Sequence, residues 1–363
     1  MENASVQYQA FRHTRYFGAL DGLRCISILA VIWWHSDPHW RSGLLGKGYL
    51  GVELFFVISG FLITTLLLRE KDENSQISLR NFYIRRTLRI FPLYYLVVAV
   101  YVVLVLRIER RSPAGAEFFQ NLPFFLTYTS NWFLELKPGK RLIFDFAWSL
   151  ATEEQFYAVW PWVIRFSRTW RIPMLFMGGS LLVNQLAKFG LSNGYLDGNF
   201  LLVRILTSIA TPICLGCLAA YLLHRDQSFR LVYAVGGKVW SAPAAAALLI
   251  FALSVSTPSL LVHLAMTYLV VTCCIRPDHR LNAVLANRVI RYVGTISYGM
   301  YLLHMLAINA ASRIAPGWSA GAFFVLGLLL TVVLASISYW LLERPTLRFK
   351  ERFESRLSGF RIA

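Results

Sequence analysis

Charged residues are scarce in this sequence: they make up 15% of its 363 residues, whereas hydrophobic residues make up 56%. A soluble domain carries about 25% charged residues. The shortage excludes an ordinary soluble globular protein, and the length allows about ten apolar spans of ~20 residues with their loops. The sequence therefore predicts an all-α fold, a polytopic bundle of membrane-spanning helices.

Acidic residues are fewer still, 19 against 36 basic residues, which gives a formal net charge of +17. Such an excess could indicate nucleic-acid binding, but most of the basic residues lie in short loops beside apolar runs. Basic short loops are typical of the cytoplasmic side of membrane proteins. The charge thus favours a membrane protein with no nucleic-acid partner.

Cysteine is also sparse, with five residues that all lie within apolar runs. Cys214 and Cys217 have the spacing of half a zinc site, but no second pair of ligands accompanies them. Small residues that pack helices together are the simpler interpretation, so we expect no metal site.

The apolar runs set the predicted membrane topology. An additional run, 118–133, is interrupted by Asn121, Pro123 and Asn131, and could be a span or a re-entrant segment. Counting it as re-entrant leaves about ten spans and gathers the basic loops on the side of the N-terminus, except in the long loop 107–146. We therefore expect both termini in the cytoplasm. The predicted spans are approximately 18–35, 50–68, 91–106, 147–164, 173–191, 199–223, 239–255, 258–275, 290–311 and 319–342.

No internal repeat or linker divides the chain. We expect a single transmembrane domain over 1–363, with its core at about 17–346 and a basic cytoplasmic tail at 347–363. The basic, partly apolar stretch 78–90 is expected to form a separate helix on the inner membrane surface.

Two ionisable residues, Arg24 and His35, lie on the first predicted span. Their separation of eleven residues is three helical turns plus about 20°, so they share one helix face about 16 Å apart along the axis. Ionisable groups within a span are costly, and they usually face a protein interior or a wet cavity. This pair predicts an active site embedded in the membrane.

Further polar residues within or beside the other spans extend this pattern. Simpler interpretations stay open: Glu153 or Glu154 could pair with Arg204, His304 could orient a neighbour, and the arginines of 85–89 could bind anionic lipid. The polar residues are Glu53, Trp148, Ser149, Glu153, Glu154, Ser297, Tyr301, His304, Tyr339 and Glu343.

Several of these residues stand in strings that resemble the acyltransferase 3 family of membrane acyltransferases. They include Arg24 with His35 and the string Trp148-Ser-Leu-Ala-Thr-Glu153-Glu-Gln-Phe-Tyr157. The string Gly51-Val-Glu-Leu-Phe-Phe-Val-Ile-Ser-Gly60 departs from the family, which more often has Asp in place of Glu53. The remaining matches are Arg86-x-x-Arg89, Tyr301-Leu-Leu-His304 and Tyr339-Trp-Leu-Leu-Glu343-Arg-Pro345.

The resemblance implies an O-acyltransferase, most simply an O-acetyltransferase, in a bacterial inner or cytoplasmic membrane. The expected donor is cytoplasmic acetyl-CoA or another acyl-CoA, with no metal. The expected acceptor is a hydroxyl of an envelope or exported glycan, such as a polysaccharide, an oligosaccharide or a lipid-linked glycan, and membrane lipid is the other expected partner.

The pattern suggests a role for each group. Arg24, Arg86 and Arg89 would bind the anionic donor, because guanidinium groups suit phosphates. His35 would act as general base on the sugar hydroxyl or carry the acyl group covalently. Either Glu153, the first choice, or Glu154 would orient it. Substrate or structural support is expected from Glu53, Trp148, Ser149, Tyr301, His304 and Glu343.

Two further expectations remain. The aromatic residues of loop 107–146, among them Phe118, Phe124, Tyr128, Trp132 and Phe133, could form a platform for the acceptor. The rival class is a transporter or flippase of a glycan or lipid intermediate, which also requires polar groups through the bundle. Its usual signs are an inverted repeat and matching broken helices, and the sequence has neither.

Overall fold

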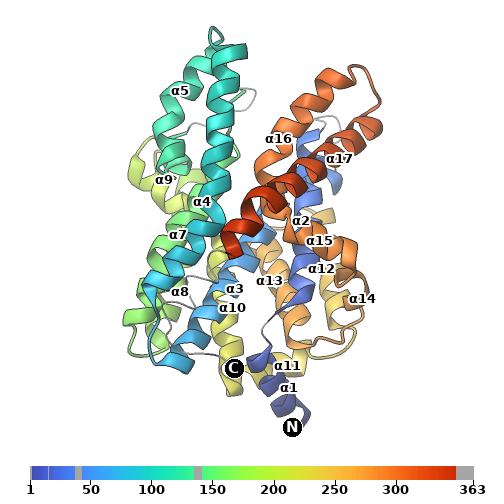
Figure 1. Ribbon diagram of the computed structural model, residues 1–363. Helices are drawn as coiled ribbons and strands as arrows, with labels where there is room; N and C mark the ends of the chain where they lie inside the picture. The colour runs from blue at the N-terminus through green and yellow to red at the C-terminus, as the bar shows by residue number, and fades with distance from the viewer. Residues whose placement is uncertain (1, 15, 37–42, 135–140, 349–363) are drawn as a thin grey trace. The chain divides into compact units, whose positions relative to one another are not determined.

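The computed structural model describes residues 2–14, 16–36, 43–134 and 141–348, and over these residues its regular secondary structure is entirely helical (Figure 1). The predicted all-α fold is therefore confirmed for this part of the chain. The predicted basic tail lies outside it, apart from its first two residues.

The chain divides into two compact units. The first unit comprises Met1–Ser75, Thr169–Gly178 and Thr211–Ile337, and the second comprises Gln76–Arg168, Gly179–Ala210 and Ser338–Ala363. Each unit is therefore assembled from segments that are distant in the sequence.

The first unit contains the N-terminal helices and most of the C-terminal half of the chain. Its helices are α1 (Glu2–His13), α2 (Gly18–Ser36), the 3-10 helix η2 (Leu45–Leu50), α3 (Gly51–Asn74), α10 (Thr211–His224), α11 (Asp226–Gly236), α12 (Ser241–Ser254), α13 (Ser259–Ile275), α14 (Asn282–Leu285), α15 (Arg288–Thr295), α16 (Ser297–Ile314) and α17 (Ala320–Ser338).

The second unit contains the middle of the chain and the segment that follows α17. Its helices are α4 (Leu79–Leu104), the π-helix η3 (Val105–Glu109), α5 (Pro113–Leu126), α6 (Ser130–Phe133), α7 (Ala147–Phe166), α9 (Leu201–Ser208) and the π-helix η4 (Tyr339–Glu343). Helix α8 (Arg171–Ser192) begins in the first unit and continues in the second.

Several helices are long and apolar enough to cross a membrane. Three qualify singly among the described residues, Leu45–Asn74, Leu79–Glu109 and Ala320–Arg348, and the number rises to six if each bent helix pair is one span. The membrane character of the chain is therefore supported. The helix bounds also follow the predicted apolar runs closely, as in α2 for 18–35 and α7 for 147–164.

One local expectation is corrected. The stretch 78–90 is not a separate helix, because α4 runs without a break from Leu79 to Leu104 and carries Pro92 inside it. The run 118–133, for which a span and a re-entrant segment were both open, is divided between α5 and α6, with Tyr128 at a φ of 53° in the turn between them. The left-handed backbone at Tyr128 is uncommon for a residue other than glycine, and it ends the helix there.

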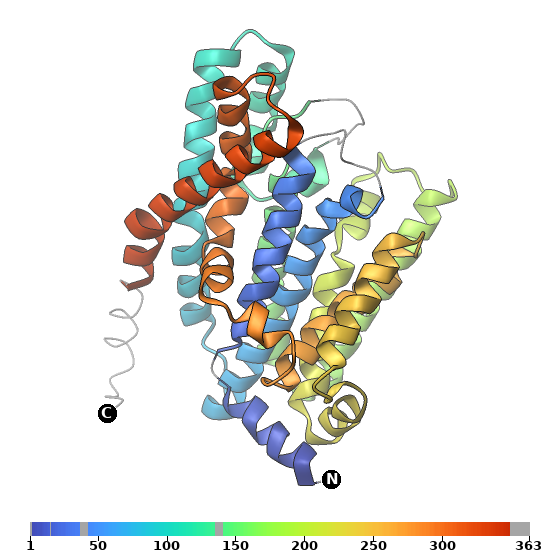
Figure 2. The same ribbon diagram turned by 90° about the vertical axis from the view of Figure 1, so that its right-hand side faces the viewer.

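Helix α2 lies in the interior of the first unit. Figure 2 shows it running alongside α3, with α15 and α16 on its other side. Glycines allow the close contacts: a Cβ on Gly51 would lie 2.4 Å from the carbonyl oxygen of Ser27, and one on Gly294 only 1.9 Å from that of Asp21. Since no other residue fits there without a shift, α2 packs closely against the start of α3 and the end of α15.

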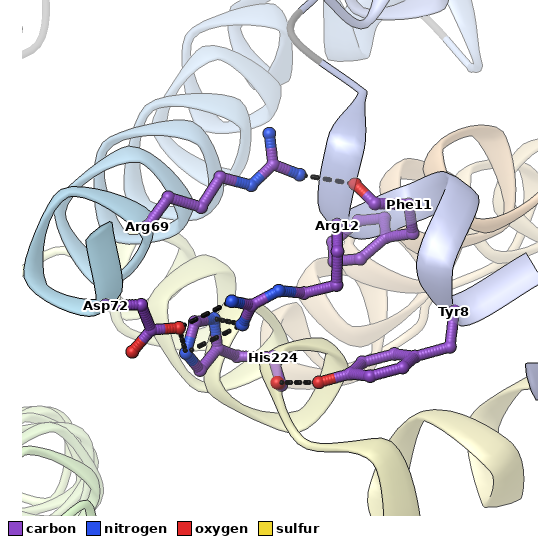
Figure 3. A network of polar contacts seen from close by, with 6 residues as sticks. All are labelled: Tyr8, Phe11, Arg12, Arg69, Asp72 and His224. Carbon is purple, nitrogen blue, oxygen red and sulfur yellow. Dashed lines mark hydrogen bonds and ion pairs between the residues drawn. The ribbon is translucent and has the colours of Figure 1, made fainter.

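The N-terminal helix α1 is fastened to this core by the polar network in Figure 3. Arg12 Nη2 donates to Asp72 Oδ2 at 2.6 Å, and Tyr8 donates to the backbone oxygen of His224 at 2.7 Å. Arg69 donates to the oxygens of Phe11 and Thr14, at 2.6 and 2.5 Å. A guanidinium on these carbonyls complements the negative end of the α1 dipole, so the chain enters α2 from a fixed point.

Candidate active site

His35 lies in the last turn of α2, beside a second imidazole in the same unit. Its ring is 4.9 Å from the ring of His304 on α16, centroid to centroid, in an edge-on arrangement. His304 is completely buried. The structure therefore brings together two of the predicted site residues that the sequence separates by more than two hundred positions.

The hydrogen bonds of the two rings determine which nitrogen can act as a base. His35 Nδ1 lies 2.9 Å from the carbonyl oxygen of Val31, and His304 Nδ1 lies 2.5 Å from that of Tyr301. A carbonyl oxygen only accepts, so each Nδ1 carries the proton. In the neutral rings the lone pair is then on Nε2, which is the form that a general base requires.

Arg24 lies in the other half of α2 and is bound to a buried carboxylate. Its Nη1 donates to Asp21 Oδ1 at 2.7 Å, one helical turn away. The Tyr16 hydroxyl also donates to Asp21, and Arg291 Nε donates to the Tyr16 oxygen at 3.3 Å. Burial, and then the hydrogen bond to Asp21, raise the pKa of Tyr16, so the phenol stays a protonated donor.

This network leaves part of the Arg24 guanidinium available. The Arg24 side chain is 18% exposed, and among the described residues only its Nη1 has a hydrogen-bond partner. A guanidinium has five donors, so Arg24 can hold Asp21 and still bind an anion. Asp21 therefore fixes the position of the Arg24 guanidinium and leaves other N–H groups of that guanidinium available.

Glu53 forms a pair that the sequence did not predict. Its Oε2 is in close hydrogen-bonding contact with Nε2 of His263, a buried residue on α13. Glu53 stands in the first turn of α3, where the helix dipole favours a negative charge. His263 was missed because a single histidine in an apolar run gives no signal of its partner, which lies 210 positions away.

In the second unit, the predicted carboxylates lie on α7. Glu154 is within electrostatic range of Glu153 and Arg86, and its Oε1 is buried without a hydrogen-bond partner among the described residues. The Arg86 guanidinium lies over the ring of Tyr157, 5.1 Å from its centroid. A buried carboxylate oxygen with no donor is unusual, and it marks this part of α7 as a candidate site.

The other predicted residues of this unit have more local contacts. Ser149 donates to the carbonyl oxygen of Phe146 at 3.0 Å within α7, and Trp148, beside it, is half-buried. Glu343 is buried, accepts from Ser338 at 3.4 Å and lies within electrostatic range of Arg89. These contacts agree with structural support for Ser149 and pair Glu343 with Arg89.

Two of the five aromatic residues expected to form a platform in loop 107–146 are instead part of a core. Phe118 is completely buried and Tyr128 is 7% exposed, so neither offers its face to a substrate. The stacked pair of Phe124 and Phe133, 4.6 Å apart, remains partly exposed, and so does Trp132. The expectation was wrong for the buried members, because the segment folds back and packs its own rings together.

No group of three or more His, Cys, Asp or Glu side chains that could hold a metal ion occurs in the described part of the chain. All five cysteines are buried and free.

The comparisons with known proteins agree in one family. Residues 17–340 match the family model of the acyltransferase domain. A relative from Staphylococcus aureus (strain COL), provisionally named an O-acetyltransferase, is 28% identical over 94% of this chain and 59% of its own length. No solved structure matches.

Two further relatives have names that mention a substrate. The peptidoglycan O-acetyltransferase OatA of Listeria monocytogenes is 26% identical over 96% of this chain and 58% of its own length. A Bacillus subtilis (strain 168) protein, provisionally named a peptidoglycan O-acetyltransferase, is 28% identical over 93% of this chain and 56% of its own length. This chain thus spans less than two thirds of each of these relatives.

Proposed function

Because this chain belongs to the acyltransferase 3 family, whose model matches residues 17–340, we propose that it transfers an acyl group, most simply acetyl, from acyl-CoA to a hydroxyl of an envelope or exported glycan. The names of the relatives from Listeria and Bacillus support a peptidoglycan-like acceptor. The proposal extends the family assignment by naming the donor, the acceptor class and the residues.

The observation that carries the proposal is the protonation pattern of His35. Its Nδ1–H is committed to the carbonyl oxygen of Val31, which leaves a lone pair on Nε2. His35 Nε2 takes the proton of the acceptor hydroxyl as the oxygen attacks the thioester carbonyl. The carbon–sulfur bond then breaks, and the imidazolium returns the proton to the leaving thiolate. An acyl-histidine formed on Nε2 is the variant of this route.

We assign His304 and Tyr301 to the support of His35. The His304 ring packs edge-on against the His35 ring, and its own Nδ1 is held by the Tyr301 carbonyl. A catalytic side chain acts well only if its neighbours fix its rotamer. The packed second ring therefore fits a positioning role.

We assign Arg24, Arg86 and Arg89 to the phosphates of the donor. Arg24 is held by Asp21 and retains free donors, which suits a fixed cation for an anionic group. Arg86 and Arg89 are one turn apart on α4. Glu153 and Glu154 are proposed to stabilise the charge that develops on the base, whereas Trp148, Ser149 and Glu343 support the fold around α4 and α7.

We also propose the full topology of ten spans with both termini in the cytoplasm. Each of the ten apolar runs coincides at least partly with a helix, and up to six helices or bent helix pairs, such as α9 with α10, are long and apolar enough to cross a membrane. This topology makes the protein multi-pass and suits a bacterial inner or cytoplasmic membrane. Labelling of single cysteines introduced at Asn193 and at Arg280 tests it, because only the former should react with an impermeant reagent from outside.

The transporter alternative is less well supported, because the family match is to an acyltransferase domain. A direct assay separates the two classes. Purified protein in lipid nanodiscs receives acetyl-CoA with glycan from the host envelope, and mass spectrometry detects acetyl esters on the sugar. Ester formation by the wild type and none by His35→Ala is the expected result. Equal ester formation by both proteins would refute the general-base assignment.

A further inference from the structure

His263 has no role in the proposed function, and Glu53 has only the general expectation of substrate or structural support. Both side chains belong to the first unit, with Glu53 at the start of α3 and His263 one turn into α13. Building on the proposed function, we propose that Glu53 binds a non-reacting hydroxyl of the glycan acceptor and that His263 is the positioning residue that holds the Glu53 carboxylate in place.

Stability does not explain why Glu53 and His263 are paired. His263 is 3% exposed, and its Nδ1 is buried with no hydrogen-bond partner among the described residues. A buried imidazole nitrogen without a partner costs about 1–3 kcal/mol. An apolar side chain of similar size at this position would avoid that cost, since buried charged pairs are often no more stable than packed apolar residues.

Glu53 retains an accessible acceptor oxygen. Its Oε2 contacts His263 Nε2, and its Oε1 has no hydrogen-bond partner in the described part of the chain. The Glu53 side chain is 26% exposed, in contrast to the enclosed ring of its partner. The imidazole therefore fixes one carboxylate oxygen and leaves the other free for an O–H donor.

The start of α3, which carries Glu53, packs closely against the helix that carries His35. Gly51, two residues before Glu53, packs on the backbone of Ser27 in α2. Tyr49, one turn before Glu53, has its ring 5.2 Å from that of Trp34, which directly precedes His35. The start of α3 thus lies along the half of α2 that ends in the proposed base.

A hydroxyl-binding carboxylate in this region matches a polyhydroxylated acceptor. Charged hydrogen bonds to a substrate hydroxyl contribute strongly to the choice of substrate, because the carboxylate is left without its donor when an analogue lacks that hydroxyl. The Glu53 carboxylate is not expected to bind the acyl donor, because it would repel the anionic end of acyl-CoA. The pair should therefore affect acceptor binding and leave donor binding unchanged.

The test uses the full-length protein in nanodiscs, with acetyl-CoA as donor and chitopentaose, a soluble oligomer of N-acetylglucosamine, as acceptor. His263→Leu removes the donor to Glu53, whereas His263→Gln keeps an N–H at a similar reach. Glu53→Gln removes the charge with little change in shape. His279→Leu is the matched control, because His279 is also a buried histidine of the first unit, but its ring nitrogens have no hydrogen bond to a carboxylate in the described part of the chain.

The expected result is a rise of about tenfold or more in the acceptor KM for Glu53→Gln and His263→Leu, the size expected for one lost charged hydrogen bond. The acetyl-CoA KM should stay within about twofold, His263→Gln should recover most of the loss, and the double variant Glu53→Gln/His263→Leu should be no worse than Glu53→Gln alone.

Two outcomes would overturn the inference. One is an acceptor KM in Glu53→Gln and His263→Leu equal to that of the wild type. The other is an equal rise in both KM values together with a lower melting temperature, which means that the pair only ties α3 to α13. If His263→Leu does not fold, Glu53→Gln and His263→Gln decide the question alone.

A separate binding measurement distinguishes this inference from the proposed function. Calorimetry of chitopentaose in the absence of donor should show weaker binding by Glu53→Gln than by the wild type. Binding that depends on Glu53 without any acetyl transfer would refute the proposed activity and retain the hydroxyl site. Transfer that is indifferent to Glu53 and His263 would refute the site and retain the activity.

Discussion

The two ends of helix α2 hold a partly buried polar side chain in opposite ways. Near its N-terminal end, the charge of Arg24 is compensated by Asp21, and Tyr16 and Arg291 extend the network. At its C-terminal end, the ring of His35 contacts another imidazole and donates to a backbone carbonyl. One end holds a permanent charge in place, and the other holds a neutral ring with a lone pair.

This difference matches the two tasks proposed for the helix. A group that binds an anion should keep both its position and its charge. Arginine stays charged, and the buried carboxylate of Asp21 holds the Arg24 guanidinium in place. A general base must gain and lose a proton, so a permanently charged partner within hydrogen-bond distance would bias it towards one state. The following predictions test this contrast, from the largest expected effect to the smallest.

His35→Ala should lower the rate of acyl transfer at least about a hundredfold, because general-base catalysis contributes that much or more. The donor KM should change little, since Arg24 and its network are left intact. Initial rates of acetyl ester formation, measured with saturating acetyl-CoA, give the comparison. Transfer above a tenth of the wild-type rate would contradict a base role for this ring.

Arg24→Gln should destabilise the protein by about 3 kcal/mol, because it leaves Asp21 buried without its cation. The double variant Asp21→Asn/Arg24→Gln should recover much of the melting temperature, since no unpaired charge remains. Donor affinity should stay low in both variants. Thermal melts and acetyl-CoA titrations separate the two effects, and a double variant with normal donor affinity would show that Arg24 is purely structural.

His304→Phe should lower the transfer rate about tenfold and leave the melting temperature nearly unchanged. Phenylalanine keeps the ring that packs on His35 but loses both nitrogens. The parallel variant Tyr301→Phe serves as the control, because the His304 hydrogen bond goes to the backbone oxygen of Tyr301 and not to its hydroxyl. A normal rate in His304→Phe would reduce His304 to a packing residue.

The smallest effect concerns His279, a buried histidine in the loop between α13 and α14. Burial lowers its pKa, and the neighbouring Asp278 only partly opposes this. The folded state therefore binds the proton less readily than the unfolded chain, so stability is fully present above about pH 6.5 and is lost as the pH falls below it. His279→Gln should flatten this pH dependence. An unchanged slope in pH-dependent melts would show that other groups cause it.

Much of the fold could be predicted from the sequence because helix formation and membrane insertion are local properties. The run 18–35 became α2 and the run 147–164 became α7, each within two residues at either end. The family was also predicted correctly from the strings around Arg24, Glu153 and Tyr301. Errors occurred where tertiary packing decides, as in the aromatic rings of loop 107–146 that form a core.

The candidate site was predictable only along single helices. The shared face of Arg24 and His35 follows from helical periodicity alone. Helical periodicity does not predict that His35 contacts His304 or that Glu53 contacts His263. Each pair joins residues more than two hundred positions apart.

The sequence by itself determined that this protein is a helical membrane protein of the acyltransferase family. Apolar runs and short motifs depend only on residues that are close together in the sequence. Only the tertiary structure decided which polar groups compensate one another. Close contacts at Gly51 and Gly294 fix how α3 and α15 meet α2, and such packing depends on shapes that distant parts of the chain bring together.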